Sequence, residues 1–189
     1  MALATASPST DHPPADEAVR AVTAADGLEA GLRRAGIGSG DLGTASVRLR
    51  LDPLHLASTP ASRERRAPLR HLPARTLLWL RLGASEHLLR TTVDHLRGRQ
   101  LGDGLLIHNP VVRTQLALAA TEQLVVEAEL TEQVGVPRTD SARRLNRTLT
   151  DIDRLLLRLL GAWSFLEAGP GTDALVSECL PGFASAGES

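Results

Sequence analysis

The stretch RTLLWLRLGASEHLLRTTVDHLRGRQL, residues 75–101, decides the fold of this chain. Residues 76–84 are apolar on nearly every side of a helix, which predicts that several other elements cover this half. From Leu88 onward the apolar residues narrow to one stripe at helical spacing, so the helix should become amphipathic towards its end. The small residues 83–85 should let a neighbouring backbone come close at the midpoint. We expect residues 101–104, LGDG, to end the helix in a left-handed turn.

Further helices follow this one. An asparagine cap and a first-turn proline, Asn109–Pro110, predict the start of a second long helix, and residues 135–137 should stop it. A third helix should run from Thr139 to Leu160 with a leucine-rich face turned inward. A last short helix is expected from Thr172 to Leu180. Three long helices joined by short connections predict an antiparallel helical bundle, a mainly α fold.

The residues before the bundle carry weaker signals. Residues 16–34 have the apolar spacing of a short helix, which Gly27 and Gly31 weaken. The alternating residues 45–51 are typical of a strand. We therefore divide the chain into a disordered tail at 1–14, a short helix and strand remnant with an Arg- and Pro-rich linker at 15–73, the helical bundle domain at 74–181 and a frayed C-terminus at 182–189.

The glycine-dense segment GIGSGDLG, residues 36–43, has the composition of a phosphate-binding loop. A dinucleotide-binding fingerprint needs a strand before the glycines and a helix after them. Here a strand is expected after the glycines, so we interpret the segment as turns.

Composition excludes several classes of protein. Apolar residues make up 42% of the chain but aromatic residues only 2%, so the core should consist mainly of leucine, alanine and valine. The 21 basic residues, all arginine, balance 22 acidic ones, which argues against a nucleic-acid-binding protein. No apolar run is long enough for a membrane span, and residues 1–6 lack the positive region and long apolar core of a signal peptide, so we expect neither feature. Because the single Cys179 cannot form a disulfide within the chain, we expect a cytoplasmic protein.

The sequence lacks the motifs by which helical bundles commonly bind metal ions and the motifs of common hydrolytic active sites. No glutamate on the expected helices is followed three residues later by histidine, so a metal site of the di-iron type is not expected. Asp151 and Asp153 lie two residues apart on a helix and should face different ways. No nucleophile elbow with a Ser-His-Asp set occurs either. The residues alone thus predict a bundle without a self-evident active site.

Three segments, residues 79–89, 95–102 and 109–117, resemble the C-terminal helical domain of the flavin-dependent acyl-CoA dehydrogenases. Residues 31–36, followed by residues 47–56, are similar to the last strands of that family's middle β-domain, which would make them a short β-containing remnant. The resemblance implies FAD as a cofactor shared with a partner chain. It also implies cofactor-binding roles for Arg97, Arg99 and Gly161.

The resemblance breaks at the catalytic base of the family. At one of the two positions where the family places its glutamate, this chain has Arg75 and Thr76. At the other position, residues 184–187 offer no carboxylate, so no catalytic residue is assigned. The implied function is therefore a partner or non-catalytic subunit that completes an FAD-dependent acyl-CoA dehydrogenase. Two alternatives stay open. One is a stand-alone bundle that binds or converts an acyl thioester or hydrophobic intermediate without flavin, and the other is a structural bundle that associates with copies of itself.

Overall fold

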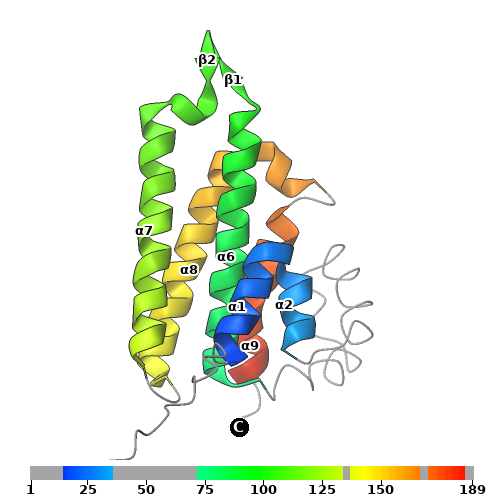
Figure 1. Ribbon diagram of the computed structural model, residues 1–189, viewed down its shortest axis with the longest axis vertical. Helices are drawn as coiled ribbons and strands as arrows, with labels where there is room; N and C mark the ends of the chain where they lie inside the picture. The colour runs from blue at the N-terminus through cyan, green and yellow to red at the C-terminus, as the bar shows by residue number, and fades with distance from the viewer. Residues whose placement is uncertain (1–14, 36–71, 134–136, 167–169, 186–189) are drawn as a thin grey trace, which may run out of the picture.

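The computed structural model describes residues 15–35, 72–133, 137–166 and 170–185. These residues are mainly helical, which confirms the predicted fold class. In chain order the elements are α1 (Ala15–Asp26), α2 (Leu28–Arg34), α6 (Ala74–Arg97), β1 (Gln100–Leu101), β2 (Gly104–Leu105), the 3-10 helix η2 (Leu106–His108), α7 (Pro110–Glu132), α8 (Thr139–Leu160), the 3-10 helix η3 (Gly161–Phe165) and α9 (Pro170–Ser185). The three long helices α6, α7 and α8 run up, down and up (Figure 1).

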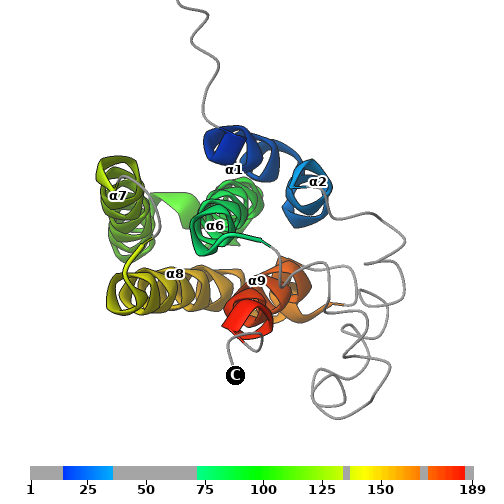
Figure 2. The same cartoon turned by 90° about the horizontal axis from the view of Figure 1, so that it is seen from below.

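Helix α6 lies at the centre of the bundle, as its apolar sequence predicts. It packs against α1, α2, α7, α8 and α9, which surround it when the molecule is viewed along its long axis (Figure 2). Leu78, Trp79, Leu80 and Leu82 on this helix are at most 1% exposed. These large side chains on several sides of one helix contribute to both clusters of buried apolar residues that form the core.

The midpoint of α6 touches the backbone of α1. A Cβ atom added to Gly83 would lie 2.6 Å from the carbonyl oxygen of Arg20 and 2.8 Å from Cβ of Thr23. The predicted close approach at residues 83–85 is confirmed, and glycine is the residue that permits it. Arg20 also forms an ion pair with Glu86 at 2.6 Å and another with Glu127.

The start of α7 and both ends of α8 lie where the sequence predicts them. The side chain of Asn109 accepts hydrogen bonds from the backbone nitrogens of Val111 at 2.9 Å and Val112 at 3.4 Å. This is the predicted asparagine cap. After α8, residues Gly161–Phe165 form the 3-10 helix η3.

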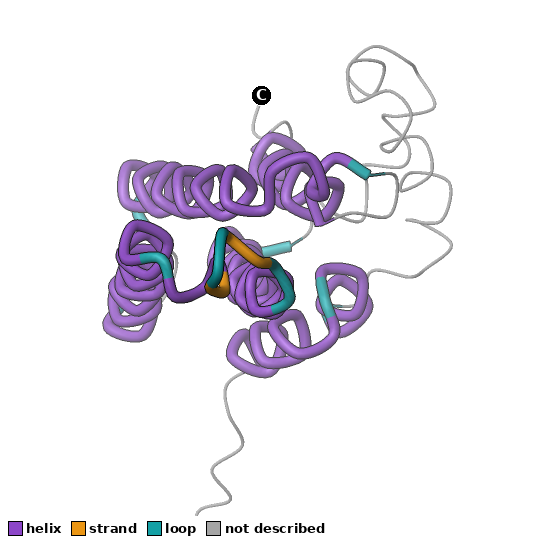
Figure 3. The backbone as a smooth tube through the Cα atoms, turned by 90° about the horizontal axis from the view of Figure 1, so that it is seen from above, coloured by secondary structure: helices purple, strands orange, loops and turns teal. Residues whose placement is uncertain are grey.

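Three predicted helix ends are wrong. α6 ends at Arg97, four residues before the predicted end, because Gly98 caps it and the strands β1 and β2 form a small antiparallel hairpin beyond (orange in Figure 3). α9 begins at Pro170 instead of Thr172 and continues through Pro181 to Ser185, where fraying was expected. Leu180 is only 1% exposed within the core beside α1 and α2, and this packing offsets the cost of the proline.

Residues 15–35 form two helices where one was expected. Gly27 separates them with a φ angle of +89°, a conformation that favours glycine. Gly31 stays inside α2, against the side chain of Thr23. The predicted strand at 45–51, the glycine-dense segment and the tail lie outside the described residues.

None of the helices that the structure describes is both long and apolar enough to cross a membrane.

Candidate functional site

Helix α8 carries one buried carboxyl group. Asp153 is 4% exposed on the side that faces α6, whereas Asp151 is exposed to solvent. The prediction that these two carboxylates face different ways is confirmed. Asp153 lies on the apolar stripe of α8, one position after Ile152, which is also buried.

A buried arginine lies close to this carboxyl group. Arg81 is 1% exposed, although it stands in the most apolar part of α6. Its guanidinium group donates to the side-chain oxygen of Asn146 at 2.7 Å, to the hydroxyl of Thr150 at 3.0 Å and to the hydroxyl of Ser177 at 3.4 Å. Burial lowers the pKa of Arg81, an effect that the negative charge of Asp153 opposes.

The carboxyl group of Asp153 is only partly satisfied. It takes a hydrogen bond from Ser85, whose hydroxyl in turn accepts one from Nε2 of Gln123 at 2.9 Å. Its Oδ1 atom has no hydrogen-bond partner. Burial raises the pKa of Asp153 to about 7, and Ser85 and Arg81 oppose this rise only in part. The group can therefore exchange a proton near neutral pH.

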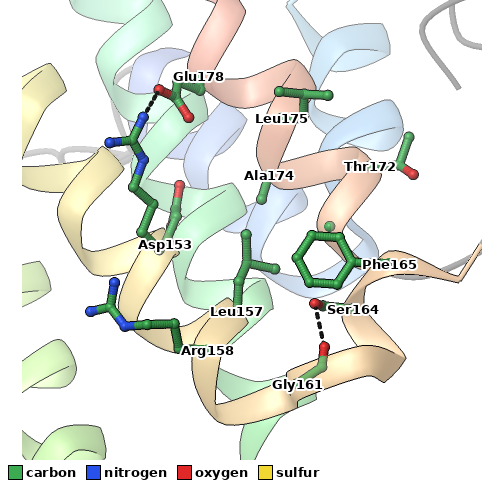
Figure 4. Close-up of a pocket in the computed structure, with 12 residues that line it drawn as sticks. Asp153, Leu157, Arg158, Gly161, Ser164, Phe165, Thr172, Ala174, Leu175 and Glu178 are labelled. Atoms are coloured by element: carbon green, nitrogen blue, oxygen red, sulfur yellow. Dashed lines mark hydrogen bonds and ion pairs between the residues drawn. The ribbon is translucent and has the colours of Figure 1, made fainter. Parts of the chain in front are cut away.

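A pocket of about 540 Å³ opens beside Asp153, between α8, η3 and α9 (Figure 4). Leu157, Phe165, Ala174 and Leu175 give it a largely apolar wall. The full lining consists of Asp153, Arg154, Leu157, Arg158, Gly161, Ser164, Phe165, Gly171, Thr172, Ala174, Leu175 and Glu178. A volume of this size holds one small molecule.

Charged side chains lie at the edge of this pocket. Arg154 and Glu178 form an ion pair at 2.6 Å that links α8 to α9. Arg158 is exposed and forms no ion pair with another described residue. Its positive charge is therefore available to a ligand with a negative group.

The three residues predicted to bind FAD lie at one end of the bundle. Gly161 ends α8 with a φ angle of +60° and lines the pocket. Arg97 forms an ion pair with Asp94 at 3.1 Å, and Nη1 of Arg99 lies 3.5 Å from Nε2 of His95. Of these three residues, Gly161 lines the pocket, and Arg97 and Arg99 do not.

At this end of the bundle, an aromatic contact connects α6 to η3. The ring of His95 stacks on that of Trp163 with centroids 4.4 Å apart, which joins the last turn of α6 to η3. Burial and the nearby Arg99 lower the pKa of His95. Among the described residues, no group of three His, Cys, Asp or Glu side chains could hold a metal ion.

Sequence reasoning missed Arg81 and Asp153 as a pair, although a signal was present. Arg81 is a charged residue within a run of leucines, and Asp153 occupies a position of the α8 stripe that spacing assigns to the core. Charged residues are rarely buried, so such positions indicate either a structural network or a site.

Comparisons of this chain with protein-family models, curated proteins and solved structures gave no match. The resemblance to acyl-CoA dehydrogenases, the FAD cofactor and the partner chain therefore stay predictions. The geometry of the pocket is the basis on which a function can be proposed.

Proposed function

We propose that this chain binds an acyl thioester, or a closely similar amphipathic acyl compound, in the pocket between α8 and α9. The observation that carries the proposal is that buried Asp153, whose Oδ1 atom has no hydrogen-bond partner, is one of the residues that line a largely apolar pocket. A buried polar atom without a partner costs about 1–3 kcal/mol, which a ligand that hydrogen-bonds to it would recover.

The pocket lining favours this class of ligand. Leu157, Phe165 and Leu175 offer apolar surface to a hydrocarbon chain. Protonated Asp153 can donate a hydrogen bond, and the carbonyl oxygen of an acyl group accepts one. The free charge of Arg158 at the edge attracts the negative groups of a thioester carrier or a carboxylate. Flavin takes no part in this binding.

Isothermal titration calorimetry with a medium-chain acyl-CoA, at pH values on both sides of 7, tests the proposal. Affinity should fall as the pH rises through about 7, because ionised Asp153 cannot donate to a carbonyl oxygen. The variant Asp153→Asn keeps an N–H donor at every pH, so its affinity should stay nearly constant. Asp151→Asn, two residues away on the exposed side, is the matched control and should behave like the unchanged protein.

Filling the pocket provides a second test. Leu175 is 38% exposed, so Leu175→Trp can place a larger ring at the pocket wall without disturbing the deep core. We expect at least about tenfold weaker binding, which corresponds to about 1.4 kcal/mol. Coenzyme A without an acyl chain should bind more weakly than the acyl compound. Equal binding of both, or no effect of Leu175→Trp, would contradict an acyl ligand in this pocket.

The partner-subunit function is the second proposal. Arg97, Arg99 and Gly161 lie at the same end of the bundle, where two exposed guanidinium groups could approach a flavin held by another chain. An absorbance spectrum of the purified chain alone, and of the chain copurified with an acyl-CoA dehydrogenase-like protein, tests this. Flavin bands only in the complex would support it, and a colourless complex would contradict it.

A further inference from the structure

Helix α7 lies at the edge of the bundle and has a second apolar face (Figure 2). Its inward side packs against α6 and α8 through residues such as Leu116, Val126 and Leu130. The opposite side, which we call the α7 outer face, consists of Ala117, Leu118, Thr121, Leu124, Val125 and Ala128, all exposed. Leu118 is 52%, Leu124 63% and Val125 46% exposed. This face contains no charged residue and continues over three turns of helix, which is typical of an interaction surface.

We propose that the α7 outer face pairs in an antiparallel arrangement with the same face of a second copy of this chain. Thr121 lies at the middle of α7 and at the centre of the face, so a twofold axis there covers the whole face. Helical spacing then sets Leu118 opposite Val125 of the second copy, and Leu124 opposite Ala117. A large residue meets a smaller one at each place, as close helix packing requires.

The charges at the two ends of α7 select the antiparallel direction. Arg113 near the start and Glu132 at the end are both exposed, and neither forms an ion pair with another described residue. Antiparallel pairing brings Arg113 of each copy towards Glu132 of the other. Parallel pairing would place like charges side by side, and it would also align the two helix dipoles unfavourably.

Other partners fit this face less well. Besides Arg113, α7 carries only acidic charged residues: Glu122, Glu127, Glu129 and Glu132. An anionic membrane surface would repel such a helix, because interfacial helices are rich in basic residues. A second copy of this chain supplies both the apolar face and the complementary charge at each end.

Sedimentation velocity of the full chain over a range of concentrations tests the inference. We expect a dimer whose dissociation constant rises at least about tenfold in Leu124→Glu, since a charge enters the centre of the interface. Leu101→Glu is the matched control, because Leu101 is 54% exposed in strand β1 and does not belong to the α7 outer face, so this change should leave the dimer unchanged. A monomer at all concentrations, or a dimer insensitive to Leu124→Glu, would overturn the inference.

Three further substitutions test the geometry of pairing: the two charge exchanges report its direction, and a cysteine at position 121 reports the place of the twofold axis. Arg113→Glu and Glu132→Arg should each weaken the dimer, and the double exchange should restore it only if the helices are antiparallel. In a Cys179→Ser background, Thr121→Cys should form a disulfide-linked dimer rapidly because the twofold axis brings the two residues together. Failure of this crosslink while the dimer persists would overturn the antiparallel arrangement. None of these outcomes depends on ligand binding in the pocket.

Discussion

Replacing Asp153 with asparagine should remove a large part of the pH dependence of this protein's stability. In the unfolded chain the carboxyl group has an ordinary pKa of 3.8, whereas burial raises the pKa to about 7 in the folded protein. Between these two values the folded state binds more protons than the unfolded state, so the free energy of unfolding falls as the pH rises. This decrease in the free energy of unfolding is complete once the pH exceeds the pKa of Asp153 in the folded protein.

The magnitude follows from the size of the shift. Each pKa unit corresponds to about 1.4 kcal/mol, so the rise from 3.8 to about 7 for Asp153 corresponds to about 4 kcal/mol. Asparagine has nearly the same shape and keeps a carbonyl oxygen for the Ser85 hydroxyl. Asp153→Asn should therefore unfold less readily than the unchanged protein at about pH 8, and its advantage should vanish near pH 4.

Urea unfolding followed by circular dichroism, at several pH values between about 4 and 8, measures this difference. The contributions of other groups that titrate in this range cancel when the free energy of unfolding of the variant is compared with that of the unchanged protein at each pH. Asp151→Asn is the control on the exposed side of the same helix and should follow the unchanged protein. We would consider the reasoning refuted if the free energies of unfolding of Asp153→Asn and the unchanged protein differed by an amount that stays constant within about 1 kcal/mol over this pH range.

Three further predictions concern the bundle itself, each measurable by urea unfolding. Gly83→Ala should lower the free energy of unfolding by about 1–3 kcal/mol, because its Cβ atom would lie 2.6 Å from the carbonyl oxygen of Arg20. Gly98→Ala is the control and should be nearly neutral, because the atom nearest to its Cβ lies 3.7 Å away. Asn109→Ala removes the cap of α7 and should cost about 1 kcal/mol. Arg20→Met leaves Glu86 without its ion-pair partner and should cost about 2 kcal/mol.

Much of the helical architecture could be predicted because its signals are local. The asparagine cap of α7 and the uninterrupted leucine spacing of α8 act within a few residues, so the sequence displays them directly. The end of α6 was harder, because the hairpin beyond Gly98 competes with continued helix over the same residues. The extension of α9 past Pro181 depends on the packing of Leu180 in the core, which no local pattern contains.

The candidate site could not be predicted in the same way, because its parts come from distant segments. Arg81 on α6 reaches Asn146 and Thr150 on α8 and Ser177 on α9, contacts that span 65 to 96 positions. Arg81 and Asp153 each stand out in the sequence as charged residues at core positions, but the sequence does not show which groups they contact. Only the packing of three helices reveals that their polar groups satisfy one another.

The hydrogen bonds of Arg81 explain why Asp153 is left with a free oxygen. If the guanidinium group had paired directly with the carboxylate, the close positive charge would hold the pKa of Asp153 low and both oxygens would be occupied. Instead its donors go to neutral acceptors on Asn146, Thr150 and Ser177, so the positive charge acts on Asp153 only from a distance. Burial then outweighs attraction, the pKa rises to about 7, and Oδ1 stays unpartnered beside the pocket. The same arrangement that satisfies a buried arginine thus leaves, in the lining of the pocket, the carboxyl group that we propose contacts an acyl carbonyl.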